Sequence, residues 1–176
     1  KRRERGILVV LEDIHDPHNA AAIMRTCDAL GIQDVWLIFE QEKAWNPRRV
    51  GKSSSSSANK WLSFRTWKTT AECAEALRSE GYASVGTVID GERELPDAAF
   101  GGEGKSARGG GSGHRGLSSG ARSAAAFTVR IPMKGFVESL NVSVATAIVL
   151  YEIARQRHMP YMAAEAAALA AEWRKR

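Results

Sequence analysis

The 176-residue sequence has few cysteines, no excess of acidic residues and no long apolar run. Its two cysteines, Cys27 and Cys73, lie far apart, which excludes a disulfide scaffold and a zinc ribbon and suits a reducing compartment. The longest predominantly apolar run, residues 142–150, is much shorter than the roughly 20 residues that cross a bilayer. The first residues do not resemble a secretory signal. We therefore expect no membrane partner and a cytoplasmic location, or an organellar one if a targeting segment preceded Lys1.

The composition is that of a globular protein, with 44% hydrophobic and 26% charged residues, and the length suits one domain. Lysine and arginine number 25 against 20 acidic residues, which gives a net charge of +5. Basic residues gather at 1–5, 48–52, 155–157 and 174–176. This clustering indicates either a polyanionic partner such as nucleic acid or a solvated charged surface, and composition alone does not separate the two.

The first forty residues predict a strand, a helix and a second strand. Residues 7–11 are continuously apolar, as in a strand covered on both faces. Apolar residues at helical spacing follow, with Asn19 placed to cap the helix and Gly31 to end it. Residues 35–39 form another apolar run. This order predicts a βαβ unit and a parallel sheet.

The rest of the chain continues the alternation of helices and strands. A helix is expected at 70–80, closed by Gly81, and a buried, largely apolar helix at 141–157. We expect further strands at 82–89 and 127–131, and an alanine-rich helix at 162–174. The predicted fold class is therefore α/β, with a parallel sheet flanked by helices.

Two segments depart from this pattern. Residues 53–57 are five consecutive serines, which predict a loop. Residues 101–123 hold nine glycines and almost no apolar side chain, so by composition they form a linker. The segment nevertheless lies where an α/β domain needs a central strand, and residues 106–111 could be drawn into an extended slot between parallel neighbours.

Short motifs in the chain point to neither a dinucleotide nor a metal. Residues 111–116 match G-x-G-x-x-G, but neither a recognisable strand before them nor a strong helix after them supplies the required context. His15 and His18, with Asp13 and Asp16, lie in a turn without the fixed spacing of ligands on a helix. We interpret them as polar loop residues and predict no metal site.

Two longer segments carry a specific resemblance. Residues 19–31 read Asn-Ala-Ala-Ala-Ile-Met-Arg-Thr-Cys-Asp-Ala-Leu-Gly and, with 11–18 before them, closely resemble motif 1 of the SpoU/TrmH branch of the SPOUT RNA methyltransferases. Residues 131–145 read Ile-Pro-Met-Lys-Gly-Phe-Val-Glu-Ser-Leu-Asn-Val-Ser-Val-Ala and resemble its motif 3. Residues 59–62 and 155–157 also match segments of TrmH-type tRNA guanosine 2′-O-methyltransferases.

The resemblance implies a fold, a cofactor and a reaction. The fold would be an α/β domain over residues 1–160 with a deep C-terminal trefoil knot over about 81–157, followed by a helical extension over 161–176. S-adenosylmethionine would bind in the knot of a homodimer. The methyl group would go to a ribose 2′-hydroxyl of RNA, most simply a guanosine of tRNA, with ribosomal RNA as an alternative target.

The same resemblance assigns roles to individual residues. The catalytic positions are Asn19, Arg25, Ser139 and Asn141. The cofactor positions are Thr87, Gly111, Ile131, Met133 and Leu140. The RNA-binding positions are Arg25, Arg48, Arg49, Arg155 and Arg157.

Chemistry and local pattern qualify these roles. A guanidinium is a poor base at neutral pH, so Arg25 is better suited to gripping a phosphate beside the target ribose and stabilising the developing alkoxide. Without the resemblance, Asn19 and Asn141 would be simple helix caps and Arg25 a surface charge.

The sequence departs from the family at motif 2. Relatives have an apolar strand that leads to Gly-x-Glu and a glycine-rich turn, whereas here Gly113 stands at the glutamate position and Arg108-Gly109-Gly110 replaces apolar residues. This departure predicts a weakened strand and a loosened cofactor pocket. It leaves open a second class of function, a knotted RNA-binding protein with impaired catalysis.

Overall fold

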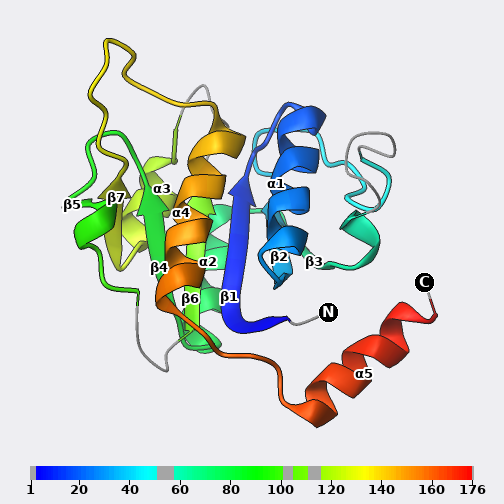
Figure 1. The fold of residues 1–176 in the computed structure, drawn as a ribbon. Helices are drawn as coiled ribbons and strands as arrows, with labels where there is room; N and C mark the ends of the chain where they lie inside the picture. Colours follow the sequence, from blue (N-terminus) through cyan, green and yellow to red (C-terminus); the bar gives the residue numbers. More distant parts are fainter. Residues whose placement is uncertain (1–2, 51–57, 101–104, 111–115, 176) are drawn as a thin grey trace.

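The structure is a computed structural model that describes residues 3–50, 58–100, 105–110 and 116–175. Within these residues one parallel sheet has the strand order β3-β2-β1-β6-β4-β7-β5 (Figure 1). The strands are β1 (Glu4–Glu12), β2 (Ile32–Ile38), β3 (Ser63–Trp67), β4 (Tyr82–Thr87), β5 (Arg93–Glu94), β6 (Lys105–Gly110) and β7 (Phe127–Arg130). The helices are α1 (Pro17–Ala29), α2 (Thr70–Ser79), α3 (Ser119–Ala124), α4 (Val142–Gln156) and α5 (Ala163–Trp173), with 3-10 turns η1 (Ala58–Lys60) and η2 (Leu95–Asp97).

Helices cover both faces of the sheet, with α1 and α4 on one side and α2 and α3 on the other (Figure 1). Strand β1 supplies side chains to both layers because successive residues point to opposite faces. Val9 and Leu11 join the core under α1 and α4, whereas Leu8 and Val10 pack with Trp36 on the α2 side. The predicted α/β fold with a parallel, doubly covered sheet is confirmed.

The predicted βαβ unit is present, but its helix starts earlier than expected. Asp16, not Asn19, is the N-cap of α1, and its carboxylate accepts the backbone N–H of His18. Pro17 occupies the first helical position, where a missing N–H costs nothing. Asn19 therefore lies inside the first turn and its side chain is available for another partner. Gly31 ends the helix with φ of 77°, as predicted.

The glycine-rich segment contains a central strand. Strand β6 lies between β1 and β4, with Val9 opposite Arg108 on one side and Val85 opposite Arg108 on the other. The expectation of a linker is therefore wrong for these six residues, and the alternative, an extended segment between parallel neighbours, is confirmed for residues 106–110. Two neighbouring strands offer backbone hydrogen bonds that need no apolar side chain. Residues 101–104 and 111–115 lie outside the described part.

Helix α4 is buried on one side only, unlike the expectation that its apolar first half would be enclosed. Val149 and Leu150 are fully buried, whereas Val144 is 47%, Ile148 38% and Tyr151 62% exposed. No described helix is both long enough and apolar enough to span a membrane.

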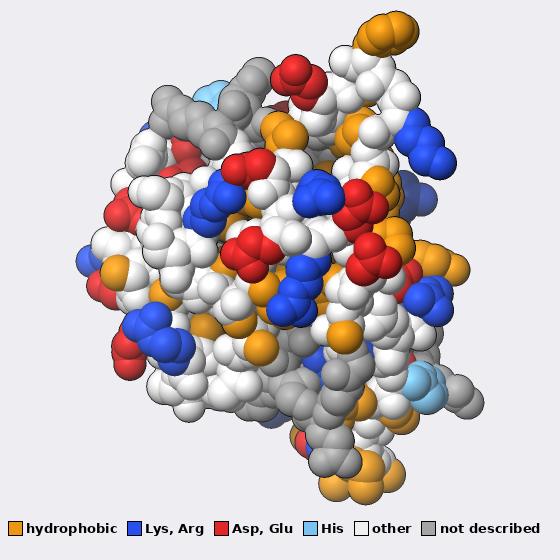
Figure 2. Space-filling view, turned by 90° about the vertical axis from the view of Figure 1, so that its left-hand side faces the viewer, with side chains coloured by type: hydrophobic (Ala, Val, Ile, Leu, Met, Phe, Trp, Pro, Cys, Tyr) orange, Lys and Arg blue, Asp and Glu red, His pale blue; other side chains and the backbone are white. Residues whose placement is uncertain are grey.

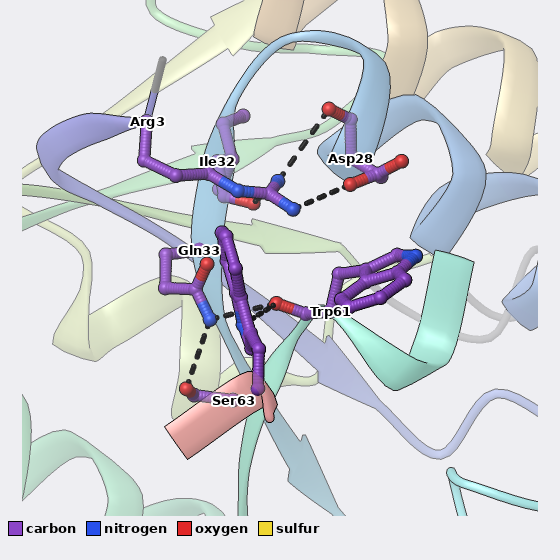
Figure 3. Close-up of polar contacts among 7 residues, drawn as sticks. Arg3, Asp28, Ile32, Gln33, Trp61 and Ser63 are labelled. Atoms are coloured by element: carbon purple, nitrogen blue, oxygen red, sulfur yellow. Dashed lines mark hydrogen bonds and ion pairs between the residues drawn. The ribbon is translucent and has the colours of Figure 1, made fainter. Parts of the chain in front are cut away.

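Helix α5 extends below the domain and is attached to the amino edge of the sheet, where the strands begin (Figure 1). The Trp173 ring lies 5.7 Å from that of Trp61, and its Nε1 donates to the Trp61 carbonyl oxygen at 3.0 Å. At the same edge, Arg3 pairs with Asp28, and Gln33 donates to the Trp61 carbonyl oxygen at 2.9 Å (Figure 3). Buried polar side chains thus fix this edge.

Candidate functional site

The two motif asparagines meet at the opposite, carboxyl edge of the sheet. Asn19 lies at the start of α1 and Asn141 at the start of α4, and each helix follows the carboxyl end of a strand. The Asn141 Nδ2 donates to the Asn19 Oδ1 at 3.1 Å, across 122 residues of sequence. In open α/β sheets ligands bind at this edge. The contact joins motif 1 to motif 3.

Asn141 is held in one orientation by its other bonds. Its Oδ1 accepts the backbone N–H of Ser143 at 2.8 Å and the Ser143 hydroxyl at 2.7 Å. Because the oxygen is used as the cap of α4, the amide nitrogen must face Asn19. Asn141 is therefore the N-cap of α4 and also makes a second contact. Ser139, two residues earlier, is exposed in the loop that leads to this cap.

Arg25 is exposed on α1 but is not joined to the asparagine pair. It lies six residues after Asn19, roughly 9 Å further along the helix axis. Among the described contacts, no hydrogen bond or ion pair links its guanidinium to Asn19 or Asn141. The side chain is thus accessible to a ligand outside the protein, and its catalytic role stays a prediction.

Two of the five expected cofactor positions lie at the ends of adjacent strands. Thr87 ends β4 and Ile131 follows β7, and the two strands pair through Thr87 and Val129. Met133 and Leu140 lie in the loop between β7 and α4, which rises above this edge (Figure 1). Gly111, which follows β6, lies outside the described residues.

The side chains at these strand ends suit S-adenosylmethionine. Ile131 and Leu140 are half-buried, Met133 is 37% exposed, and Ile89, just after β4, is 67% exposed. An adenine ring packs against apolar side chains, and its nitrogen atoms form hydrogen bonds with backbone groups such as those at strand ends. The residues present therefore fit the cofactor, with Thr87, Ile131, Met133 and Leu140 as those that would hold it.

The arginines expected to bind RNA fall into three environments. Arg48 and Arg49 are exposed after β2. Arg155 is paired with Glu152 at 2.7 Å, and this contact lowers the pKa of Glu152 to about 2. Arg157 is only 4% exposed, and burial lowers the pKa of its guanidinium. The fold thus places Arg157 in the interior, so we remove it from the predicted RNA surface.

The charge pattern differs between sides of the molecule. On the face beside β5, β7 and α3, positive and negative side chains alternate (Figure 2). Arg122 pairs with Asp90 and Arg130 with Glu94, so the positive charge of both arginines is offset locally. Arg48 and Arg49 lie toward the other end of the sheet, after β2. A polyanion is therefore better suited to that end.

Sequence reasoning missed the residue that shapes the motif 1 loop. Asp13 has φ of 46°, and its Oδ1 accepts the backbone N–H groups of residues 40, 41 and 42 at 2.9 to 3.1 Å. Beside it, His15 Nδ1 lies 2.9 Å from Glu42 Oε2, which raises the pKa of His15. An acidic residue directly after a buried strand was the available signal. These bonds fix the path that leads to Asn19.

Similarity to characterised proteins extends over most of the chain. Residues 6–151 match the SpoU rRNA Methylase family. The tRNA (guanosine(18)-2′-O)-methyltransferase of Escherichia coli K12 is 32% identical over 164 residues, which cover 89% of this chain and 66% of that protein. The enzyme of the same name from Thermus thermophilus is 33% identical, with 89% and 78% covered. The 23S rRNA (guanosine-2′-O-)-methyltransferase RlmB of Coxiella burnetii is 32% identical, with 91% and 62% covered.

Solved structures agree with this similarity. The A. aeolicus TrmH/SpoU tRNA modifying enzyme superposes with a TM-score of 0.85 at 24% identity and covers 97% of this chain and 88% of its own, which shows a shared fold. The SpoU methyltransferase AviRb of Streptomyces viridochromogenes, in complex with AdoMet, has a TM-score of 0.74 at 30% identity, with 88% and 59% covered. With motifs 1 and 3 in contact on this fold, the chain belongs to the SpoU rRNA methylase family.

Proposed function

We propose that this protein is an S-adenosylmethionine-dependent RNA methyltransferase that modifies the ribose 2′-hydroxyl of a guanosine in tRNA. The observation that carries the proposal is the Asn19–Asn141 contact at the carboxyl edge of the sheet, which joins the two motifs of the family. A relative named for tRNA and one named for 23S rRNA have the same sequence identity to this chain, 32%. The comparisons therefore support the reaction more strongly than the class of RNA.

The chain's own residues have mainly positioning tasks in this reaction. Bound S-adenosylmethionine supplies an activated methyl group. The Asn19–Asn141 pair holds the starts of α1 and α4 at one separation, so a ribose placed between motif 1 and motif 3 meets a fixed geometry. Arg25 would bind the adjacent phosphate and stabilise negative charge on the 2′-oxygen as that oxygen takes the methyl group and its proton passes to water.

The direct test is incubation with labelled S-adenosylmethionine and either total tRNA or ribosomal RNA, followed by mapping of the modified ribose. We expect label in tRNA at a guanosine 2′-oxygen. Label in ribosomal RNA alone would replace the tRNA assignment. Absence of label with retained RNA binding would favour the RNA-binding protein that the altered motif 2 suggests.

We propose that RNA binding depends on Arg48 and Arg49, which are exposed and adjacent. Phosphate contacts release counterions, so log affinity should fall linearly with log salt concentration between about 50 and 200 mM. Replacing both arginines with alanine should reduce that slope by about 2. The matched control is Arg78→Ala, on α2, where Glu75 lies 2.6 Å away. An unchanged slope would remove this pair from the RNA surface.

We also propose a homodimer formed through α1 and α4. A groove between these helices is lined by Leu30, Ile131, Ile148 and Tyr151, and the last two are substantially exposed. A second copy would cover this apolar face, which monomers rarely expose. Ile148→Asp should give monomers in analytical ultracentrifugation. Met162→Asp, at a similarly exposed apolar position before α5, should leave the dimer intact.

A further inference from the structure

Glu12 is a buried carboxylate that the proposed mechanism does not use. It ends β1 at the carboxyl edge of the sheet and is 4% exposed. Burying a carboxylate is costly unless hydrogen-bond donors surround it. Three donors from the described residues do so here. The Thr70 hydroxyl and the Ser118 hydroxyl each lie 2.6 Å from Oε1, and the Ser118 backbone N–H donates to Oε2 at 3.0 Å.

The two partners of Glu12 belong to different parts of the fold. Thr70 opens α2, which packs on the apolar part of the sheet. Ser118 is the N-cap of α3 and follows the glycine-rich turn of motif 2. Glu12 and Ser118 are 106 residues apart, so their contact depends on the tertiary fold. The carboxylate thus connects Ser118, which follows motif 2, to the end of β1, which precedes motif 1.

The residue before Ser118 is held by packing. A Cβ placed on Gly86 would lie 2.9 Å from Leu117 Cδ2, and one on Gly109 would lie 3.5 Å from Leu117 Cδ1. Leu117 therefore occupies space that β4 and β6 leave open by having glycine at these positions. Gly116, with φ of 66°, turns the chain into this segment. Residues 116–118 form an anchor with one apolar and one charged attachment.

We propose that Glu12 is a positioning residue for the cofactor and acts through this anchor. The idea rests on the proposed function, because the ends of β4, β6 and β7 form the cofactor edge. The resemblance places a glutamate of motif 2 at position 113, where this chain has glycine. The carboxylate of Glu12 holds the returning chain at a fixed distance from Thr87 and Ile131, the neighbouring strand ends. A charge-assisted bond to Ser118 is strong enough for this task.

The test compares the hydrogen bonds that Glu12 accepts from Ser118 and from Thr70. Ser118→Ala removes the Ser118 hydroxyl, and Glu12→Gln weakens the bonds to both partners. Thr70→Val, the matched control, removes only the Thr70 hydroxyl. We expect the first two to raise the Kd of S-adenosylmethionine in calorimetry about tenfold, the effect of losing roughly 1.4 kcal/mol. Thr70→Val should lower the melting temperature about as much as Ser118→Ala does. It should change the Kd less than about twofold, because the hydrogen bond from Thr70 connects Glu12 to α2 and not to the cofactor edge.

A second readout does not need the cofactor. In amide hydrogen exchange, Ser118 should be protected in the wild type and in Thr70→Val and should exchange faster in Glu12→Gln. Equal exchange in all variants would overturn the anchor. Equal cofactor Kd values in Ser118→Ala and Thr70→Val would overturn its role in positioning. If the wild type bound no S-adenosylmethionine, the proposed function itself would fail, and the exchange data would still decide whether the anchor exists.

Discussion

The two edges of the sheet are built in different ways. At the amino edge, Arg3 donates to the Ile32 carbonyl oxygen and lies over the Trp173 ring. Gln33 donates to the carbonyl oxygen of Trp61, whose ring contacts Trp173. At the carboxyl edge, Ser139 is exposed, and Arg25 is exposed on α1, the helix that leads away from this edge. The side chains named at the amino edge contact other protein groups, whereas Ser139 and Met133 beside the carboxyl edge remain accessible to a ligand. Substitutions at the two edges should therefore separate stability from activity.

The largest effect is expected for Arg25→Ala, on the exposed side of α1. Loss of a group that stabilises developing charge should lower the methylation rate by about 10² to 10³-fold. The Kd of S-adenosylmethionine should stay within a few-fold, and the melting temperature should not change, because the side chain is exposed. Calorimetry and a rate measurement on the same preparation check this. Loss of cofactor binding together with activity would show that the assigned role is wrong.

The counterpart at the amino edge is Asp28→Ala. Arg3 has a side chain that is only 5% exposed and would lose its charged partner. Breaking a buried pair in this way should lower the free energy of unfolding by about 3 kcal/mol. Methylation by the folded fraction should be unchanged. Denaturant unfolding measures the loss, and Glu75→Ala, which breaks an exposed pair with Arg78, should cost less than about 0.5 kcal/mol.

Asn141 both caps α4 and contacts Asn19, and two substitutions separate these roles. Asn141→Asp keeps a cap oxygen for Ser143 but cannot donate to Asn19, so stability should hold while the rate falls by about 10²-fold through misplacement. Asn141→Ala should lose the same activity and about 1 kcal/mol of stability. Full activity in Asn141→Asp would show that the contact between the asparagines is dispensable.

The smallest effect is expected for Trp173→Ala. Its ring contact with Trp61 and its hydrogen bond attach α5 to the domain, so loss should weaken that attachment by about 1 kcal/mol. Amide exchange should accelerate in α5 alone, with methylation unchanged. Trp173→Phe retains a ring and should give an intermediate result. Lower activity in Trp173→Ala would contradict the separation of the two edges.

The neighbouring strands β1 and β6 show how far sequence reasoning reaches. Strand β1 is predictable because Leu8 and Val9 belong to an apolar run that is buried wherever the sheet forms. Strand β6 has glycine and polar residues, and its composition predicts a linker. It forms because β1 and β4 present unpaired backbone groups on either side of it. The short edge strand β3 is missed for a related reason, since Arg65 interrupts its apolar pattern.

The site divides along the same line. Sequence patterns predict the elements whose apolar side chains repeat at a regular spacing, the helix ends at Gly31 and Gly81, and the two motifs that identify the family. No such pattern predicts that Asn141 donates to Asn19, that Glu12 accepts from Ser118, or that Arg157 is buried, because these follow from how the chain folds. The physical reason is range. Periodicity and capping act over a few residues, whereas these contacts join positions more than a hundred residues apart or depend on what packs around them.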